Sequence, residues 1–121
     1  MRILVADNHS SARLALCALL EQQSGWLVVG EVVSADNLMS QIEDTNPDLI
    51  LVNWSMPELK TADLISDLRE NRNKIAVIVL SGRPEIRSEA LAAGADDFVS
   101  KADPPGRLLR AISSVNRSQK Y

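Results

Sequence analysis

Five polar side chains in this chain stand at the ends of short apolar runs, where they could form a binding or reaction site. They are Asp7 and Asn8 after the first run, Asn53 after a later one, then Ser81 and Lys101. In an open parallel sheet, ligands bind at the edge where the carboxyl ends of the strands meet. Because each of these residues follows a predicted strand, we expect the one acid, two amides, hydroxyl and amine to converge there.

The composition of this predicted site limits its chemistry. Its one carboxylate, Asp7, and its one amine, Lys101, carry formal charges that sum to zero. Mg²⁺ prefers carboxylate ligands, so a neutral pocket has little to attract it. The Asn53 amide is a poor nucleophile, because its oxygen lacks a full negative charge and its nitrogen lone pair is delocalised. We expect no cofactor, and weak or absent Mg²⁺ binding.

Two other reactive side chains add no further chemistry. His9 is the one histidine and has no nearby cysteine, so it is a poor metal ligand and is better placed as the lead-in to the first helix. Cys17 is the one cysteine and lies among apolar residues. We expect a buried, unreactive thiol, which is consistent with a reducing cytoplasm.

The elements that must position the site alternate apolar runs with helical patterns, which indicates βαβ units and a parallel sheet. The apolar runs are continuous, as expected for strands covered by helices on both faces. The predicted strands include residues 3–6, 26–33, 49–52, 75–80 and 98–99. With right-handed crossovers they give a flavodoxin-like, doubly wound α/β fold with five strands in the order 2-1-3-4-5.

The intervening helices are predicted from apolar residues at helical spacing and from capping signals. The first covers about residues 9–23, and the second is expected to turn Leu38, Met39 and Ile42 inward. The expected start and end signals are Ser34 for the second helix, Thr61 for the third, Pro84 and Gly94 for the fourth, and Asp103 for the fifth.

The length of 121 residues and the 45% hydrophobic content indicate one globular domain over residues 1–121. Residues 115–121 are a candidate start of a linker to an effector domain that is absent from this chain. The net charge of −3 argues against binding to nucleic-acid backbones, so we interpret Arg107 and Arg110 as solvated helix charges. With no leader sequence and no apolar run near the ~20 residues of a membrane span, we expect a cytoplasmic protein.

Four segments resemble the motifs of the receiver domain of bacterial two-component response regulators. They are residues 3–9 (ILVADNH), 51–57 (LVNWSMP), 77–82 (VIVLSG) and 93–101 (AGADDFVSK). The resemblance covers nearly all of the chain and implies the CheY-like version of the fold. In that family an acidic pair, a phosphate-accepting Asp and a backbone carbonyl hold Mg²⁺, while a strand-four hydroxyl and a Lys bind the phosphoryl group.

Carried over by position, the resemblance implies a degenerate phosphoacceptor pocket of Asp7, Asn8, Asn53, Ser81 and Lys101, in which Asn53 stands at the acceptor position. The vestigial Mg²⁺ positions are Asp7, Asn8, Asn53 and Ser55. The family's switch residues correspond to Ser81 and Phe98. Because two carboxylates are replaced by amides, their mutual repulsion is removed and Lys101 is free to pair with Asp7.

We therefore predict an atypical receiver, or pseudo-receiver, that has lost phosphotransfer and is not an enzyme. It would act as a protein-interaction or dimerisation module that controls a linked effector, such as a DNA-binding transcriptional regulator. The expected partners are a second copy and a histidine kinase or other regulatory protein.

Two alternatives stay open. One is a competent receiver whose acceptor Asp has been substituted by Asn53, although the second change, at Asn8, weighs against engineering. The other is a flavodoxin-like ligand binder, although a Gly-rich phosphate loop is missing after strand one.

Overall fold

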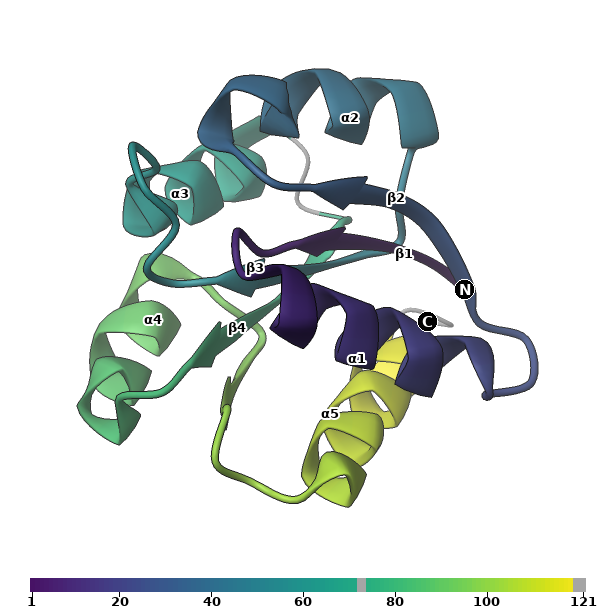
Figure 1. Cartoon of the computed structure of the whole chain (residues 1–121). Coiled ribbons are helices and arrows are strands. Elements are labelled where there is room, and N and C mark those ends of the chain that lie inside the picture. Colours follow the sequence, from purple (N-terminus) through teal and green to yellow (C-terminus); the bar gives the residue numbers. More distant parts are fainter. Residues whose placement is uncertain (72–73, 119–121) are drawn as a thin grey trace.

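The computed structural model describes residues 1–71 and 74–118 of the chain, with side chains described up to residue 116 (Figure 1). The strands are β1 (Arg2–Ala6), β2 (Leu27–Val32), β3 (Leu49–Asn53), β4 (Ala76–Ser81) and β5 (Asp97–Ser100). The helices are α1 (Ser10–Glu21), α2 (Leu38–Thr45), α3 (Thr61–Asn71), α4 (Arg87–Ala93) and α5 (Pro105–Ser118). Two 3₁₀ turns, Ala35–Asn37 and Pro84–Ile86, precede α2 and α4.

The five strands form one parallel sheet in the order β2-β1-β3-β4-β5, which confirms the predicted fold class. Helices α1 and α5 cover one face, and α2, α3 and α4 cover the other (Figure 1). Because both faces are covered, every residue of β3 and β4 is buried. The site at the carboxyl ends of these strands therefore stands on fully buried strands.

The continuous apolar runs divide their side chains between two cores. In β3, Ile50 and Val52 pack beneath α2–α4, whereas Leu49 and Leu51 pack beneath α1 and α5. This alternation is the period of two that a strand imposes. Each fully buried aliphatic side chain contributes roughly 1.5–3 kcal/mol, so a central strand stabilises both layers at once.

The second helix corrects one prediction. Leu38 and Ile42 are buried as expected, but Met39 is 38% exposed, so its predicted inward position is wrong. Ser34 precedes a 3₁₀ turn rather than the α-helix itself, and its side chain makes no capping hydrogen bond. The α-helix begins only at Leu38, and one residue further along turns the side chain about 100° away from the sheet.

Two helices end at residues with left-handed backbone. Gly94 at φ 114° ends α4, as predicted, and Asn46 at φ 47° ends α2. Gly94 is required there twice over, because an added Cβ would also lie 3.0 Å from the Arg69 side chain. Helix α5 begins at Pro105 and includes residues 115–118, and the rest of the proposed linker, residues 119–121, lies outside the described residues.

A set of contacts that we call the Arg69 clamp closes the amino end of the sheet. Arg69 on α3 donates through Nε to the Gly94 carbonyl at 2.8 Å and through Nη1 to the Ile75 carbonyl at 2.9 Å. Its Nη2 pairs with Asp96 Oδ2 at 2.8 Å, and the same oxygen accepts the Val77 N–H at 2.8 Å. One guanidinium thereby ties α3 to the end of α4 and to the chain that leads into β4 and β5.

One further finding concerns membranes. Within residues 1–71 and 74–118, the structure contains no helix that is both long enough and apolar enough to cross a bilayer.

Candidate functional site

The five polar residues predicted to converge do lie at the carboxyl edge of the sheet. Asp7 directly follows β1, and Asn53 and Ser81 are the last residues of the neighbouring strands β3 and β4. The three residues are only 1%, 3% and 2% exposed. Lys101 follows β5, and its backbone N–H donates to the Ser81 carbonyl at 2.8 Å. The sheet order alone therefore brings together residues that are up to 94 positions apart.

An ion pair lies at the centre of the site. Lys101 Nζ is 2.8 Å from Asp7 Oδ2, with the lysine side chain 28% exposed and the aspartate side chain 1% exposed. This confirms the pairing predicted from the sequence. Because the carboxylate is buried, the pair stabilises the fold only while both partners are present, and losing one partner of such a pair typically costs about 3–5 kcal/mol.

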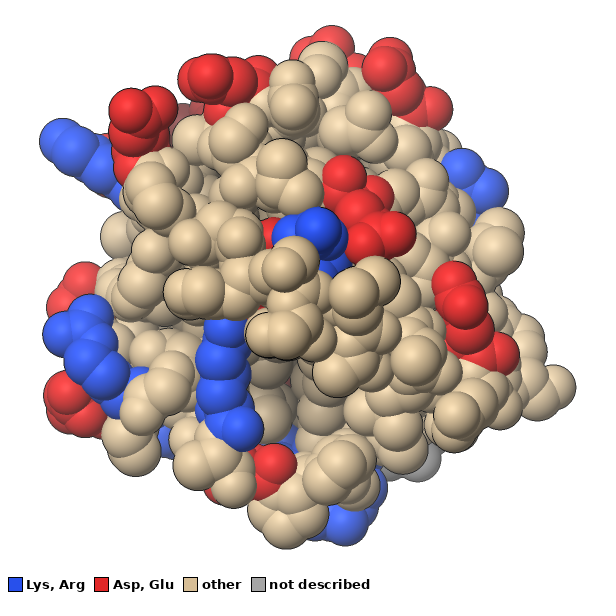
Figure 2. All heavy atoms as spheres, in the orientation of Figure 1, with Lys and Arg blue, Asp and Glu red and all other residues tan. Residues whose placement is uncertain are grey.

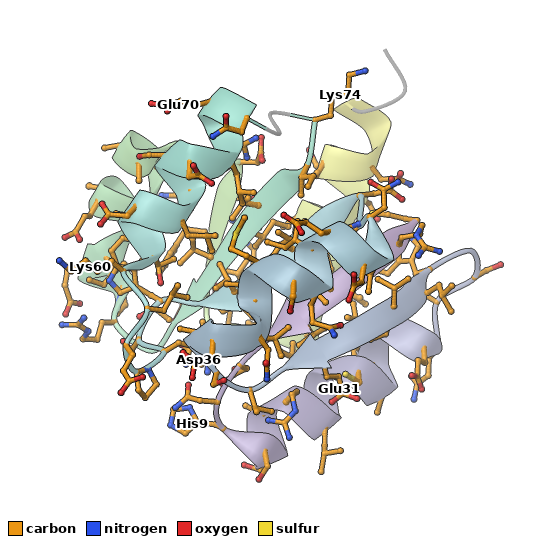
Figure 3. All side chains as sticks on the ribbon, turned by 90° about the horizontal axis from the view of Figure 1, so that it is seen from above. His9, Glu31, Asp36, Lys60, Glu70 and Lys74 are labelled. Atoms are coloured by element: carbon orange, nitrogen blue, oxygen red, sulfur yellow. The ribbon has the colours of Figure 1, made fainter. Side chains whose placement is uncertain are left out.

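The second oxygen of Asp7 is also satisfied. Asp7 Oδ1 accepts the His9 N–H at 2.9 Å and a weaker bond from Asn53 Nδ2 at 3.4 Å. His9 is the N-cap residue of α1, as predicted, and its ring is 62% exposed with Nδ1 3.5 Å from Asp7 Oδ1. Figure 3 shows His9 and Asp36 on one side of the molecule and Lys74 on the opposite side.

The Asn53 side chain stands at one of the vestigial Mg²⁺ positions and forms hydrogen bonds to the other three. Its Nδ2 donates to Asn8 Oδ1 at 3.0 Å as well as to Asp7, and its Oδ1 accepts the Ser55 N–H at 3.5 Å. Both ends of the amide are therefore engaged within the site. The Asn53 Nδ2 group therefore faces the side-chain oxygens of both Asp7 and Asn8.

These residues do not fit a Mg²⁺ ion. The ion needs several oxygen ligands, preferably carboxylates. Here the one carboxylate, Asp7, is neutralised by Lys101 at Oδ2. The Asn53 Nδ2 group donates to the two other candidate oxygens, Asp7 Oδ1 and Asn8 Oδ1. In the part of the chain that the structure describes, no three His, Cys, Asp or Glu side chains are grouped so as to hold a metal.

The two predicted switch residues lie on neighbouring strands. Ser81 is buried at the end of β4, and its Oγ accepts the Arg83 N–H at 3.1 Å. Phe98 on β5 is 4% exposed and belongs to the core beneath α2–α4. In this structure the aromatic ring is thus packed inward and the hydroxyl is held by the loop that follows its own strand.

Two arginines have roles that the sequence did not reveal. Arg13 on α1 donates to the Asp7 carbonyl at 3.0 Å and pairs with Glu31 at 3.1 Å, so it braces the backbone of the site. Arg107, predicted to be solvated, instead contacts Asp97 and the Phe98 carbonyl, each at 3.3 Å. The only feature of the sequence that could have indicated these roles is that each arginine adjoins the apolar residues of its helix.

The predicted buried thiol is confirmed, and it lies away from the site on α1. Burial, together with the nearby carboxylate of Glu31, raises the pKa of Cys17 to about 11. At neutral pH the thiol is therefore almost entirely protonated and unreactive.

Comparison with known proteins agrees with this geometry. The family model described as the response regulator receiver domain matches residues 3–113. The chain is 35% identical over 120 residues to the phosphate regulon transcriptional regulatory protein PhoB of Escherichia coli, covering 96% of this chain and 52% of PhoB. It is 27% identical to the chemotaxis protein CheY of Thermotoga maritima, covering 96% of this chain and 98% of CheY.

A solved structure of the RcsB response regulator of Salmonella typhimurium superimposes with a TM-score of 0.87 at 25% identity, covering 100% of this chain and 61% of RcsB. The chain thus spans little more than half the length of PhoB and RcsB, and nearly all of CheY. Since the family model matches most of its length, the chain belongs to the response regulator receiver domains, which are signalling domains rather than enzymes.

Proposed function

We propose that this receiver domain does not accept a phosphoryl group and signals instead through protein–protein contacts. The observation that carries the proposal is the hydrogen-bonded amide of Asn53. It donates to Asp7 and Asn8, while Lys101 neutralises Asp7 from the other side. The polar side chains of Asp7, Asn8, Asn53 and Lys101 thus have partners within the pocket.

The chemistry of phosphoryl transfer explains why this matters. Transfer to a side chain needs an oxygen with an available electron pair, together with positive charge to balance the transferring oxygens. The Asn53 amide is a weak nucleophile. The Lys101 ammonium is already bound to Asp7 at 2.8 Å, so an incoming phosphoryl group would have to displace that contact.

The output of the domain is proposed from its relatives. PhoB is named as a transcriptional regulatory protein, and the RcsB structure is described in terms of DNA interaction. Both are longer than this chain. We infer that the domain controls a linked DNA-binding effector and is itself regulated by a histidine kinase or another protein. The net charge of −3 disfavours direct contact between this domain and DNA.

The proposal is tested by offering the chain a phosphodonor. Purified protein is incubated with acetyl phosphate and Mg²⁺ and its intact mass is measured, with the T. maritima CheY as the positive control. We expect a phosphoryl mass gain on CheY and none on this chain. A phosphorylated fraction of the wild-type chain would overturn the proposal.

A matched pair of variants asks how far the chain is from a working receiver. Asn53→Asp restores only the acceptor, whereas Asn53→Asp with Asn8→Asp restores the acidic pair as well. If the single variant gains a phosphoryl group as readily as CheY, then Asn53 alone blocks the reaction, as expected for a single substitution in a competent receiver. If only the double variant reacts, both positions have diverged.

A further inference from the structure

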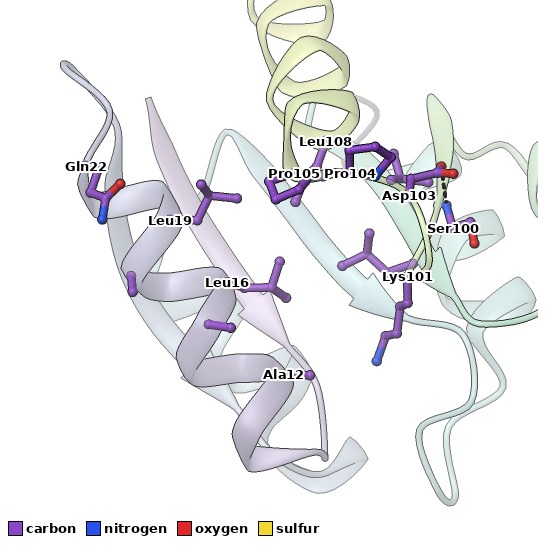
Figure 4. Close-up of a pocket in the computed structure, with 14 residues that line it drawn as sticks. Ala12, Leu16, Leu19, Gln22, Ser100, Lys101, Asp103, Pro104, Pro105 and Leu108 are labelled. Atoms are coloured by element: carbon purple, nitrogen blue, oxygen red, sulfur yellow. Dashed lines mark hydrogen bonds between the residues drawn. The ribbon is translucent and has the colours of Figure 1, made fainter.

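A largely apolar groove runs between α1 and α5 on the face of the sheet that they share. It has a volume of about 490 Å³. Leu16 and Leu19 of α1 lie on one side, and Pro105 and Leu108 of α5 lie on the other (Figure 4). Figure 2 shows uncharged side chains over the middle of α1. Because ligand pockets typically have volumes of about 300–1,000 Å³ and predominantly apolar walls, the groove has the size and lining of a small-molecule site.

Small side chains on α1 leave room for the groove. Ala12, Ala15 and Ala18 line it, and each is a neighbour of the next on the helix surface because they are spaced by three residues. Leu80 of β4 and Val99 of β5 also line it, and both are buried core residues. The groove therefore reaches down to the sheet, and a molecule inside it would contact the core of the domain.

Two charged residues line the groove as well, and neither offers it an unbalanced charge. Lys101 Nζ is 2.8 Å from Asp7 Oδ2, so its charge is already neutralised within the acceptor pocket. The Asp103 carboxylate accepts the Ser100 N–H at 3.1 Å, and Figure 4 shows it turned toward Ser100 and away from α1. A charged ligand would therefore lose its hydration without gaining a matching charge, which is costly.

The Lys101 ammonium nevertheless gives the groove one directional polar group. An ammonium has three N–H donors, and among the described residues Asp7 is the acceptor that the structure places on it. The lysine side chain lines the groove and runs toward the Ala12 end of α1 (Figure 4). An oxygen acceptor on a bound molecule could thus take another of its N–H bonds while the ion pair with Asp7 stays in place.

The dimensions of the groove favour a small molecule over a protein segment. Its wall on α1 extends from Ala12 to Gln22, which is about 15 Å along a helix. A helical segment of that length and ~10 Å diameter has a volume of roughly 1,200 Å³, more than twice that of the groove. A helix of another protein, or of a second copy, could cover the groove but not enter it, whereas an alkyl chain with a small polar head fits along it.

We propose that the α1–α5 groove binds a small neutral molecule with an apolar body and one oxygen acceptor, such as a ketone, whose oxygen accepts a hydrogen bond from Lys101. The floor of the groove adjoins both switch residues. Leu80 directly precedes Ser81 on β4, and the same molecule would touch β5 at Val99, directly after Phe98. Occupancy of the groove would in this way regulate the domain without phosphoryl transfer. The inference does not depend on the phosphorylation result, because ligand binding and phosphorylation are measured separately.

NMR titrations with three probes of equal chain length test the site and its ligand class. The probes are 2-nonanone, which is neutral with an oxygen acceptor, the nonanoate anion and the nonylammonium cation. We expect 2-nonanone to shift the backbone amides of residues 12–22 and 99–103 saturably, together with the side-chain carbons of Lys101. It should bind roughly tenfold or more tightly than either charged probe, since an unmatched charge is costly to desolvate. No saturable shift up to millimolar 2-nonanone, or tighter binding of a charged probe, would overturn the proposal.

A matched pair of variants places the probe in the groove. Ala15→Phe fills part of the groove, while Ala92→Phe makes the same change at an exposed alanine on α4. We expect Ala15→Phe to bind 2-nonanone roughly tenfold or more weakly than the wild type, because the ring takes up ligand volume, and Ala92→Phe to bind it unchanged. Equal affinities of the two variants would contradict the site. Shifts of the same wild-type amides on dilution without ligand would show that another copy covers the groove, and would also overturn the proposal.

Discussion

The two ends of the sheet each hold an ion pair with a 2.8 Å contact, but the surroundings of the two pairs differ. At the amino end, the Arg69 clamp binds backbone carbonyls as well as Asp96, and the two paired side chains are 25% and 41% exposed. At the carboxyl end, Asp7 is 1% exposed and faces the side chains of Lys101 and Asn53. The first pair ties chain segments together, whereas the second fills a pocket made of side chains.

The two ends of the sheet depend on the sequence to different degrees. The clamp depends on main-chain groups that any sequence with this fold supplies, so only the arginine and its aspartate are special. The pocket depends on the identity of each side chain, because Asn53 and Lys101 together satisfy both Asp7 oxygens along with the His9 N–H. Changing one of these residues alters the charge balance of the whole pocket.

The largest effect is expected from Lys101→Met, which leaves the buried Asp7 carboxylate without its counter-charge. We expect the free energy of unfolding to fall by about 3 kcal/mol in urea titrations at pH 7, at the low end for broken buried pairs because Lys101 is partly exposed. Lys60→Met, at an exposed lysine, is the matched control and should change stability by less than about 0.5 kcal/mol. If the two variants lose the same unfolding free energy, the Lys101–Asp7 pair does not stabilise the fold.

A smaller loss is expected from Arg69→Met, which keeps the aliphatic stem and removes the guanidinium. Several hydrogen bonds are lost, each worth roughly 0.5–1.5 kcal/mol, but water can reach Asp96 and replace part of them. We expect about 2 kcal/mol by the same urea titration, with Arg110→Met as the exposed control. If the free energy of unfolding falls by more than it does in Lys101→Met, the ion pair at the amino end contributes more to stability than the pair at the carboxyl end, contrary to our expectation.

Asn53→Asp should destabilise the domain in the absence of Mg²⁺ by roughly 1–2 kcal/mol. It replaces an N–H donor with a carboxylate oxygen that faces Asp7 Oδ1 and Asn8 Oδ1. Thermal melts with and without Mg²⁺ measure the effect, and we expect Mg²⁺ to recover stability in the variant while leaving the wild type unchanged. A higher melting temperature for the metal-free variant would contradict the account of the pocket.

Cys17 provides the smallest effect, and it is confined to alkaline pH. Its pKa is raised from an ordinary 9.0 to about 11, so below pH 9 the thiol is protonated in both states and the full stabilising contribution is present. As the pH rises from about 9 to about 11, the unfolded thiol ionises first and this contribution is lost. The difference in unfolding free energy between the wild type and Cys17→Ala should therefore shrink over that range, and a constant difference would argue against burial as the cause.

The sequence predicted the sheet order and the converging residues for a physical reason. Buried strands are continuous apolar runs, and Asp7, Asn53, Ser81 and Lys101 stand at their ends. Because parallel strands all end at the same edge of the sheet, the residues at these ends meet there. The pairing of Lys101 with Asp7 was predicted because these are the two opposite charges among the five converging residues.

The features that the sequence could not predict depend on how a helix is rotated about its axis, or on residues that become neighbours only in the folded structure. The exposed position of Met39 depends on where the α-helix begins after its 3₁₀ turn. The half-buried position of Arg107 depends on Asp97, which lies across the β5–α5 connection. The direction in which the Asn53 amide points is set by Asn8, Asp7 and the Ser55 N–H together, and no residue type encodes it alone.

The most direct test of the central claim follows the Asn53 side-chain amide by nitrogen-15 NMR while Mg²⁺ is added. If the N–H group occupies the place of a cation between Asp7 and Asn8, its signals stay where they are up to millimolar Mg²⁺, apart from uniform salt effects shared with exposed amides. A saturable shift of these signals, absent from the exposed Asn37 amide, would contradict the account by showing that the ion enters the pocket.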